Sequence, residues 1–311
     1  MCCLFGVIDY GHSLTGREKN HMLSVLASVC EARGTDATGI AYNMGGTLRI
    51  YKRPVPAHRL RFRVPEQARV ILGHTRMTTQ GSAKRNYNNH PFLGVAGKDV
   101  FALAHNGMIH NDIDLRNGLH LPKTKIQTDS YIAVQLIEQK KALDFDSLKY
   151  MAEKVEGSFT FTVLDRKNRL YIIKGDNPLC LLHFPSLGLY LYASTEDILR
   201  RAMFQMELGA HTPKRISLDC GDILRIGRDG ALTRSQFDDY RLFSHWRVST
   251  WDMHYRRPQE ERMIPAPEES YLDEIKSVAS AFGYAPEEID HLVEMGFSLE
   301  ELEDYLYRGE L

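Results

Sequence analysis

The hydrophobic and polar positions of the chain fall into short blocks over the first 240 residues. Apolar residues spaced three and four apart predict a helix over Glu18–Ala32. Short runs rich in β-branched and apolar residues, bounded by polar or turn residues, predict strands. The strands predicted in this first block are Cys2–Ile8, Gly39–Tyr42, Leu48–Lys52, Arg69–His74 and Val100–His105.

A second block follows, in which two helical patterns precede a group of strands. The helices are predicted over Ser130–Lys140 and Ser147–Lys154. Because the strands are grouped rather than alternating strictly with helices, we expect an α+β layered sandwich and not a doubly wound parallel sheet. The predicted strands of this block are Phe159–Leu164, Leu170–Lys174, Leu179–His183 and Leu189–Ala193.

The pattern changes beyond Tyr240, where Arg, His, Trp and Pro interrupt the regular blocks. We interpret residues 241–267 as a linker between a domain over residues 2–240 and a small domain over residues 268–311. Gly, Pro and Ser separate helical patterns in the small domain at Tyr271–Phe282, Glu287–Met295 and Leu299–Tyr307. A small acidic three-helix module is therefore expected.

The composition is that of a globular chain whose charges are unevenly divided. Of 311 residues, 43% are hydrophobic and 25% are charged, and 39 Lys and Arg oppose 40 Asp and Glu. From residue 268 to the end, 13 acidic residues oppose 2 basic ones, a net charge of −11, which leaves +10 for residues 1–267. The near-zero total argues against a dedicated nucleic-acid binder, so a nucleic-acid partner is not expected.

The sequence does not favour membrane, secreted or metal-binding classes. No stretch reaches the roughly 18 apolar residues of a membrane span, and the apolar start lacks the basic residues of a secretory signal. Five cysteines without repeated spacing indicate neither a disulfide framework nor a structural zinc site. We expect a cytoplasmic protein with reduced thiols, no metal, no cofactor and no membrane partner.

Cys2 is the first candidate for chemistry. Removal of Met1 would free its α-amine, and an amine with a reference pKa of about 7.7–8.0 is a usable base at neutral pH. The thiol lies one side chain away, so one residue would supply both nucleophile and base. The alternative is that Cys2 and Cys3 are small apolar residues that open a buried strand.

Two charged residues are candidates for binding a small amino acid. Arg76 follows the apolar run Val70–Leu72 in a loop with several hydroxyls, including Thr79, and a guanidinium with nearby hydroxyls suits a carboxylate. Asp129 precedes a predicted helix, where a carboxylate could receive an ammonium group. The alternatives are a surface arginine beside a turn and a helix cap by Thr128 or Asp129.

Two polar motifs complete the candidates. Asn106-Gly107 follows an apolar strand, and the Asn106 side-chain amide and Gly107 N–H could donate to a developing oxyanion. The same dipeptide is also a strong signal for a hairpin with a type I′ turn. His90 lies in the turn-rich loop Asn86–Pro91, where a packed imidazole is the ordinary interpretation.

The joint order of these motifs resembles the class II glutamine amidotransferases. The resemblance covers about residues 2–235 and implies an N-terminal-nucleophile (Ntn) hydrolase domain, a four-layer αββα sandwich. The residues that carry it are Cys2, Arg33-Gly34-Thr35-Asp36, Gly73-His74-Thr75-Arg76, Asn89-His90-Pro91, His105-Asn106-Gly107 and Thr128-Asp129.

This resemblance implies catalytic roles for Cys2, Asn106 and Gly107. Mature Cys2 would attack the side-chain amide of L-glutamine, and Asn106 and Gly107 would form the oxyanion hole. Hydrolysis of the resulting thioester would give glutamate and ammonia. Only about seventy residues follow Gln236, and they contain no phosphate-cradling glycine loop, so we expect an ammonia-acceptor enzyme on another chain. The sequence is also compatible with a homo-oligomer.

The remaining matches imply roles in substrate binding. Arg76, with help from Thr79, would hold the α-carboxylate of glutamine, and Asp129 would hold its α-ammonium. His90 matches a His-Pro loop at the pocket of the family. The motif that contains Asp36 shapes a loop near the nucleophile in these enzymes.

Two other functions stay open at this point. An Ntn-type amidase acting on another amide would leave Arg76 and Asp129 unpaired, and an interaction protein could use the fold as a scaffold for its acidic tail. Within that tail, Glu287–Ser298 resembles the first helix and Met-Gly-Phe loop of ubiquitin-associated (UBA)-like domains. A generic acidic helical module is the alternative that we prefer.

Overall fold

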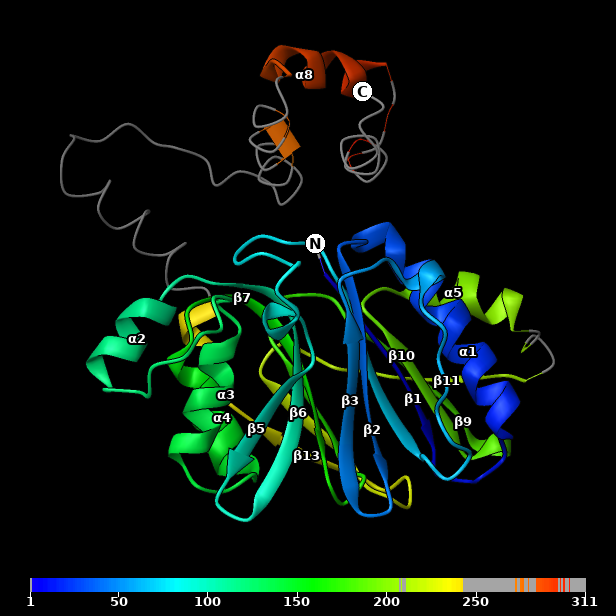
Figure 1. The fold of residues 1–311 in the computed structure, drawn as a ribbon. Coiled ribbons are helices and arrows are strands. Elements are labelled where there is room, and N and C mark those ends of the chain that lie inside the picture. The colour runs from blue at the N-terminus through cyan, green and yellow to red at the C-terminus, as the bar shows by residue number, and fades with distance from the viewer. Residues whose placement is uncertain are drawn as a thin grey trace. The chain divides into compact units, whose positions relative to one another are not determined.

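The strands between Cys3 and Gln236 form two antiparallel sheets in a computed structural model of the chain (Figure 1). The first has the strand order β11 (Lys214–Ile216), β9 (Cys180–Phe184), β10 (Leu189–Ala193), β1 (Cys3–Asp9), β4 (Val70–Arg76), β2 (Ala37–Met44) and β3 (Thr47–Arg53). The second has the order β13 (Leu232–Gln236), β12 (Asp222–Ile226), β8 (Leu170–Lys174), β7 (Gly157–Asp165), β6 (Asp99–Ile109) and β5 (Phe92–Ala96).

The structure describes residues 2–206, 208, 211–242 and 284–295, with single positions at 272, 275, 276, 279, 297, 299 and 302. The chain divides into two units, Met1–Thr250 and Trp251–Leu311. The predicted linker, residues 241–267, lies outside the described residues except for its first two positions. The proposed domain boundaries therefore stay a prediction.

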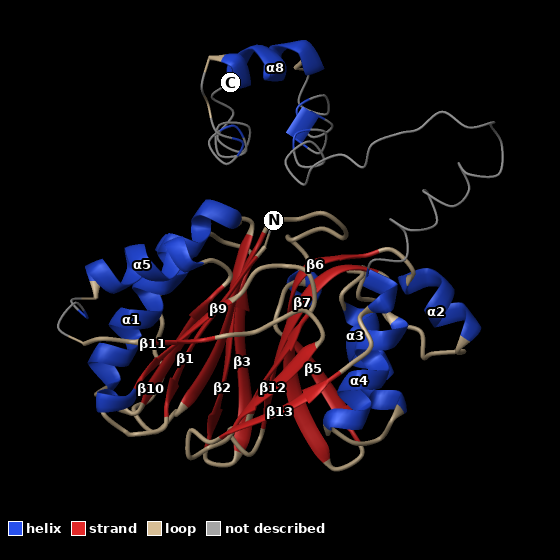
Figure 2. Cartoon of the chain, turned by 180° about the vertical axis from the view of Figure 1, so that it is seen from behind, coloured by secondary structure: helices blue, strands red, loops and turns tan. Residues whose placement is uncertain are grey.

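Helices cover the outer face of each sheet in the first unit (Figures 1 and 2). One apolar core joins the first sheet to α1 and α5, another joins the second sheet to α3 and α4, and a third lies between the sheets. The fold is thus mixed α and β with antiparallel sheets, not a doubly wound one. The helices are α1 (Gly16–Val29), α2 (Asp112–Gly118), α3 (Tyr131–Gln139), α4 (Phe145–Lys154) and α5 (Glu196–Gln205).

The boundaries of α1 follow from its cap. The Thr15 hydroxyl accepts a hydrogen bond from the Glu18 N–H, and the Glu18 carboxylate accepts one from the Thr15 N–H. This capping box satisfies two N–H groups that the helix leaves free. The helix therefore begins earlier than its apolar pattern predicts, and it gives way at Cys30 to a 3₁₀ turn.

The two central strands of the first sheet are buried on both faces. Every residue of β1 and β4 is buried, because one face packs against helices and the other against the second sheet. Such strands have continuous apolar runs rather than an alternating pattern. This explains why Cys3–Ile8 and Val70–Leu72 contain so few polar residues.

The structure corrects several expectations about the strands of the two sheets. β6 continues to Ile109, so Asn106 and Gly107 lie inside a strand paired with β7, and the type I′ hairpin turn is wrong. β5 and the three strands β11, β12 and β13 were not among the predicted elements. β11 and β13 are short and largely exposed, so they have no apolar pattern to reveal them. β5 and β12 are also short, but each contains buried apolar residues, so both have a local signal that the sequence prediction missed.

The second unit includes the helix α8 (Pro286–Glu294). Pro286 occupies its first turn, where the missing proline N–H costs no hydrogen bond. Ile275, Ala279, Ile289 and Leu302 are buried against one another. The other two predicted helices and the Met-Gly-Phe loop lie largely outside the described residues. Within the described ranges, no helix is long and apolar enough to cross a membrane.

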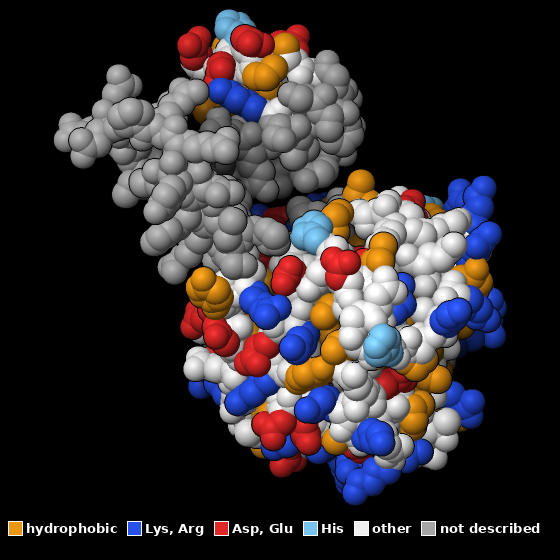
Figure 3. All heavy atoms as spheres, turned by 90° about the vertical axis from the view of Figure 1, so that its left-hand side faces the viewer, with side chains coloured by type: hydrophobic (Ala, Val, Ile, Leu, Met, Phe, Trp, Pro, Cys, Tyr) orange, Lys and Arg blue, Asp and Glu red, His pale blue; other side chains and the backbone are white. Residues whose placement is uncertain are grey.

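Charges of both signs are scattered over the face that carries α2, α3 and α4 (Figure 3). Basic and acidic side chains alternate there with small apolar areas. The positive excess expected for residues 1–267 is therefore not gathered on this face.

Candidate active site

Cys2 lies directly before β1, beside the end of β4. Its thiol donates a hydrogen bond to the Met77 carbonyl at 3.4 Å, and Arg33 Nε donates to the Cys2 carbonyl at 3.2 Å. Burial raises the pKa of the Cys2 thiol, and the hydrogen bond at Met77 and the charge of Arg76 offset only part of this rise. The thiol is protonated at neutral pH, so its attack on a substrate requires a base.

Asp36 fixes the loop that follows β4. Its N–H donates to the Arg76 carbonyl at 2.9 Å, and its carboxylate accepts a hydrogen bond from the Thr78 N–H at 2.7 Å. The residue between them, Met77, presents its carbonyl to the Cys2 thiol. The Asp36 motif therefore shapes a loop that touches the candidate nucleophile.

Arg76 is the last residue of β4, and only 2% of its surface is exposed. Burial lowers the pKa of the guanidinium, whereas nearby Cys2, Asp129 and Asp36 favour the charged form. Because all of its hydrogen-bond acceptors are neutral, its positive charge is held in place without being neutralised. These acceptors are Asn89 Oδ1 at 2.7 Å, Gln80 O at 2.5 Å, Gly81 O at 3.1 Å and Thr128 Oγ1 at 3.5 Å.

Asp129 is equally buried and is also held by neutral groups. Its carboxylate accepts hydrogen bonds from the Ile109 N–H at 2.7 Å and from the Ser130 hydroxyl at 3.4 Å, and its own N–H donates to Gln80 Oε1 at 3.1 Å. The interpretation of Thr128 or Asp129 as a helix cap is wrong, because Ser130 is the N-cap of α3. The Asp129 carboxylate instead accepts from the Ile109 N–H at the end of β6, and the Thr128 hydroxyl donates to the Asn88 carbonyl. Arg76 and Asp129 are opposite charges that interact through space without forming an ion pair.

Asn106 and Gly107 lie near the end of β6. Asn106 is completely buried, yet neither atom of its side-chain amide has a hydrogen-bond partner among the described residues. Gly107 has φ +140°, and a Cβ at this position would lie 1.9 Å from the Ser158 carbonyl oxygen, so only glycine fits. A buried amide without partners is costly in a folded protein, and it usually indicates a ligand or a water.

Three buried histidines lie behind this site. His74 donates from Nε2 to the His105 carbonyl at 2.9 Å, and burial lowers the pKa of His74 to about 3. The His90 ring packs against His74 and Phe92, at centroid distances of 4.2 and 4.4 Å, and its nitrogens have no partner among the described residues. Burial lowers the pKa of His90 well below its usual range. His90 therefore has the surroundings of a packed imidazole, and its role at a pocket stays a prediction.

Thr79 is exposed in the loop after Arg76, and no hydrogen bond of its side chain occurs within the described ranges. The hydroxyl that reaches Arg76 belongs to Thr128. Sequence reasoning did not assign Asn89, Gln80 or Thr128 to the site, although Asn89 and Thr128 each precede a residue that it did assign. Among the described residues, no group of His, Cys, Asp or Glu side chains could hold a metal ion.

Contacts join the candidates into one region. The Cys2 thiol touches the loop after Arg76, Gln80 in that loop bonds both Arg76 and Asp129, and Asp129 bonds the end of β6 just beyond Gly107. The candidate nucleophile, a buried cation, a buried anion and an unpaired side-chain amide therefore occupy neighbouring segments. Their charges and hydrogen-bonding groups are complementary to those of a small zwitterion that also carries an amide.

Known proteins with similar sequences include two enzymes. A 7-cyano-7-deazaguanine synthase of Saccharolobus solfataricus is 27% identical over 207 residues, which are 63% of this chain and 43% of that protein. A glutamine–fructose-6-phosphate aminotransferase of Bacillus licheniformis is 31% identical over 182 residues, which are 56% of this chain and 29% of that protein. The chain thus covers less than half the length of each.

The fold and a family model agree with these similarities. A glutamine phosphoribosylpyrophosphate amidotransferase from B. subtilis matches with a TM-score of 0.59 and 21% identity, over 76% of this chain and 49% of that one, which shows a shared fold. Residues 74–201 match the model of a glutamine amidotransferase domain, a range that includes Arg76, Asn106 and Asp129. Over residues 74–201 the chain therefore carries a glutamine amidotransferase domain.

Proposed function

We propose that this chain hydrolyses the side-chain amide of L-glutamine to glutamate and ammonia, with Cys2 as the nucleophile after removal of Met1. The observation that carries the proposal is the pair Arg76 and Asp129. Each charge is buried and held by neutral partners near the Cys2 thiol, and neither forms an ion pair with the other. A free amino acid supplies a carboxylate for Arg76 and an ammonium for Asp129.

The first half of the reaction forms a thioester. The α-amine of Cys2 takes the thiol proton, and the sulfur attacks the amide carbon of glutamine. The oxygen becomes an oxyanion that accepts hydrogen bonds from Asn106 Nδ2 and the Gly107 N–H. The tetrahedral intermediate then collapses, the C–N bond breaks, and the proton held by the α-amine passes to the leaving nitrogen, which departs as ammonia.

The second half regenerates the enzyme. The α-amine removes a proton from a water molecule, whose oxygen attacks the thioester carbon, and the same two donors stabilise the second oxyanion. Collapse of this intermediate breaks the C–S bond, releases glutamate and returns the proton to sulfur. Arg76, assisted by the Thr79 hydroxyl, holds the substrate through both halves, and His90 lines the pocket.

The finer assignments belong to the same proposal. The domain is a four-layer αββα Ntn-hydrolase sandwich over residues 2–240, followed by a linker over 241–267 and a small acidic helical domain over 268–311. The name of the aminotransferase relative includes glutamine. By analogy, we assign the ammonia of this chain to an acceptor enzyme subunit in the cytoplasm.

The test compares two adjacent cysteines. The protein is prepared with Met1 removed, verified by intact mass, and glutamate release is measured. Cys2→Ala should abolish hydrolysis, whereas Cys3→Ala should retain most of it, because Cys3 is fully buried and contacts Cys30 rather than the site. Absence of turnover in the Met1-free wild type, or equal loss in both variants, would contradict the assignment. Turnover of an amide without an amino-acid head group would instead favour a different amidase.

A further inference from the structure

A buried asparagine in the loop between β8 and β9 holds the strand pair that contains Asn106. Asn177 is 9% exposed, and its Nδ2 donates to the Asn106 carbonyl at 3.2 Å and to the Ser158 hydroxyl at 2.5 Å. The backbone carbonyl of Asn177 accepts a hydrogen bond from the Thr160 hydroxyl at 2.6 Å. One side chain therefore joins β6 to β7 at the level of Asn106.

The neighbouring residue strengthens this attachment. The Asp176 carboxylate accepts a hydrogen bond from the Phe159 N–H at 2.8 Å. Phe159 pairs with Gly107 in the register of β6 and β7, and Thr160 pairs with Asn106. The loop is therefore bound to the two residues of β7 that lie opposite the candidate oxyanion donors.

The bond from Asn177 controls more than the Asn106 carbonyl. The carbonyl of Asn106 and the N–H of Gly107 belong to one peptide group, which is planar, and in the trans form they point in opposite directions. A hydrogen bond that fixes the carbonyl therefore fixes the direction of the N–H. Donation to the carbonyl also polarises the peptide group, which makes its N–H a stronger donor.

This control matters because Gly107 has no side chain, so only the pairing of β6 with β7 and the bond from Asn177 hold this peptide. The Gly107 φ of +140° lies in a region that glycine enters freely, so the residue has no side chain to limit rotation of the preceding peptide. A Cβ there would lie 2.7 Å from Asn177 Nδ2, which places the Asn177 amide directly against this backbone. The Asn177 amide therefore adds a side-chain restraint on this peptide to that of the strand pairing.

We propose that Asn177 is a positioning residue of the oxyanion hole, acting through the Asn106–Gly107 peptide. The assignment rests on the proposed glutaminase function. Asn177 does not need to touch the substrate. It holds the Gly107 N–H in the direction that a tetrahedral oxyanion requires, while the Asn106 side chain supplies the second donor.

The test uses Asn177→Asp, which preserves size but replaces both N–H donors with oxygen. A carboxylate facing the Asn106 carbonyl cannot donate to it, so the peptide loses its restraint. We expect kcat for glutamine to fall roughly 10–100-fold, less than the full loss of a donor, while KM stays within about twofold, because Arg76 and Asp129 are untouched. A drop in kcat below about threefold, or a rise in KM that accounts for the whole effect, would overturn the proposal.

Asn111→Asp is the matched control. Asn111 also ties this sheet region to neighbouring backbone, with Nδ2 donating to the Lys154 carbonyl at 3.0 Å and Oδ1 accepting from the Glu156 N–H at 3.0 Å. It makes no contact with Asn106 or Gly107 among these bonds. Its variant should lower stability by a similar amount without changing kcat. An equal loss of kcat in both variants would indicate a merely structural role.

A second measurement does not depend on turnover. Hydrogen exchange at the Gly107 amide should be about tenfold faster in Asn177→Asp than in the wild type, while exchange in β1 and β4 stays unchanged. Unchanged exchange at Gly107 would overturn the positioning role even if the wild type hydrolyses glutamine. Faster exchange in a protein that never hydrolyses glutamine would leave the positioning intact and refute the proposed function.

Discussion

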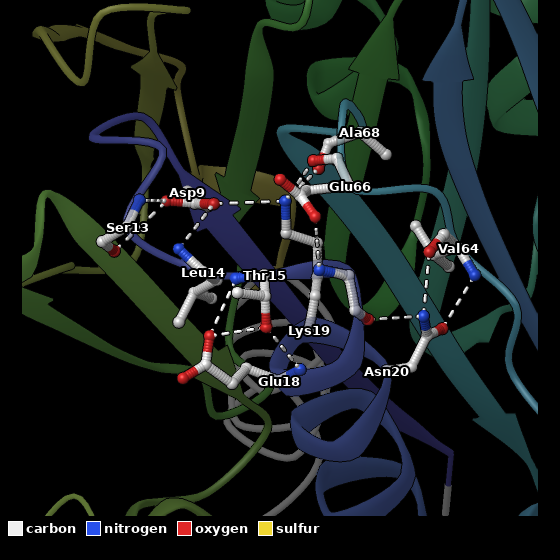
Figure 4. A network of polar contacts seen from close by, with 11 residues as sticks. Asp9, Ser13, Leu14, Thr15, Glu18, Lys19, Asn20, Val64, Glu66 and Ala68 are labelled. Carbon is white, nitrogen blue, oxygen red and sulfur yellow. Dashed lines mark hydrogen bonds and ion pairs between the residues drawn. The ribbon is translucent and has the colours of Figure 1, made fainter.

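Buried charges form an ion pair at one end of β1 but not at the other. At the Asp9 end, Lys19 Nζ lies 3.1 Å from the Asp9 carboxylate, and the side chains of both are 1% exposed. The ammonium also donates to the Glu66 and Ala68 carbonyls, and the carboxylate accepts from the Ser13 and Leu14 N–H groups (Figure 4). At the Cys2 end, Arg76 and Asp129 are equally buried but remain unpaired with each other.

The difference distinguishes charges that stabilise the fold from charges that remain available to bind a ligand. A buried ion pair whose remaining donors and acceptors are satisfied has nothing left to offer a ligand. Opposite charges that are held apart by neutral partners can still attract the charged groups of a ligand. Their burial lowers the stability of the fold, because each charge loses its contact with water. The unpaired Asn106 amide follows the same rule for hydrogen bonds. Substitutions at the two ends should therefore change different quantities.

The largest expected effect is on stability at the Asp9 end. Lys19→Met removes one partner of the buried pair and leaves the Asp9 carboxylate uncompensated, which should lower the free energy of unfolding by about 3–5 kcal/mol. KM for glutamine should stay within about twofold, because the pair has no role in binding. Urea unfolding and glutamate release measure the two quantities. Lys98, which is exposed, provides the control, since Lys98→Met should change stability by about 0.5 kcal/mol or less.

At the Cys2 end of β1, substitutions should change glutamine binding rather than stability. Arg76→Lys keeps the charge but loses the planar fork, so it should weaken glutamine binding by about 2–4 kcal/mol, seen as a rise in KM. Asp129→Asn should act similarly, and its side-chain oxygen can still accept from the Ile109 N–H. Steady-state kinetics check both variants. A KM for Arg76→Lys within twofold of the wild type would show that the guanidinium does not bind the substrate carboxylate.

The sequence predicts the chemical groups of the site better than the residues that hold them. Arg76, Asn106 and Asp129 stand out because a polar residue directly after an apolar strand, or before a helix, is conspicuous in one dimension. Gln80 and Asn177 are contacts made by loops across the fold, and nothing in their own segments marks them. Asn89 lies in a motif that carries the resemblance, but its bond to Arg76 was not predicted. Their roles follow only from the strand pairing that brings the loops together.

A similar limit applies to the fold. Capped helices such as α4, with Asp144 and Ser147 in a capping box, and buried apolar strands such as β1 have local signals. β11 and β13 are short and mostly exposed, and they exist because a neighbouring strand supplies hydrogen bonds. The Asn106-Gly107 dipeptide shows the opposite kind of error. Its sequence predicts a turn, but pairing between β6 and β7 holds both residues in an extended strand.

A smaller effect should appear with pH, because the Cys2 end also contains the buried histidines. Burial lowers the pKa of His74 to about 3 and lowers those of His90 and His105. Their folded-state pKa values lie below the unfolded value of about 6.5, so the unfolded state binds more protons between the two. Their contribution to stability is present above pH about 6.5 and is lost as the pH falls toward the folded values.

His90→Phe tests this pH dependence. The substitution removes a titrating ring that makes no hydrogen bond within the described chain, and the new ring can keep the packing against Phe92. The loss of stability between pH 6.5 and 4 should therefore become shallower, by up to about 1.4 kcal/mol per pH unit. Urea midpoints across this range measure it. His21→Gln, at an exposed position, should leave the slope unchanged, and an unchanged slope in His90→Phe would contradict the prediction.

The smallest effect on catalysis is expected from removing residues 268–311. Every candidate site residue precedes residue 178, and the chain divides into units at residues 250 and 251. A chain that ends at Pro267 should keep its kcat and KM for glutamine within about twofold.

The charges of −11 and +10 in the two parts favour association through the acidic segment, with another copy or with a basic partner. Such association weakens with salt, because exposed charges are screened beyond about 8 Å at physiological ionic strength. Analytical ultracentrifugation at low and high salt should therefore show an association that the shortened chain lacks. An inactive or insoluble shortened chain would mean that residues 268–311 complete the core of the catalytic domain, and the two-domain organisation would be wrong.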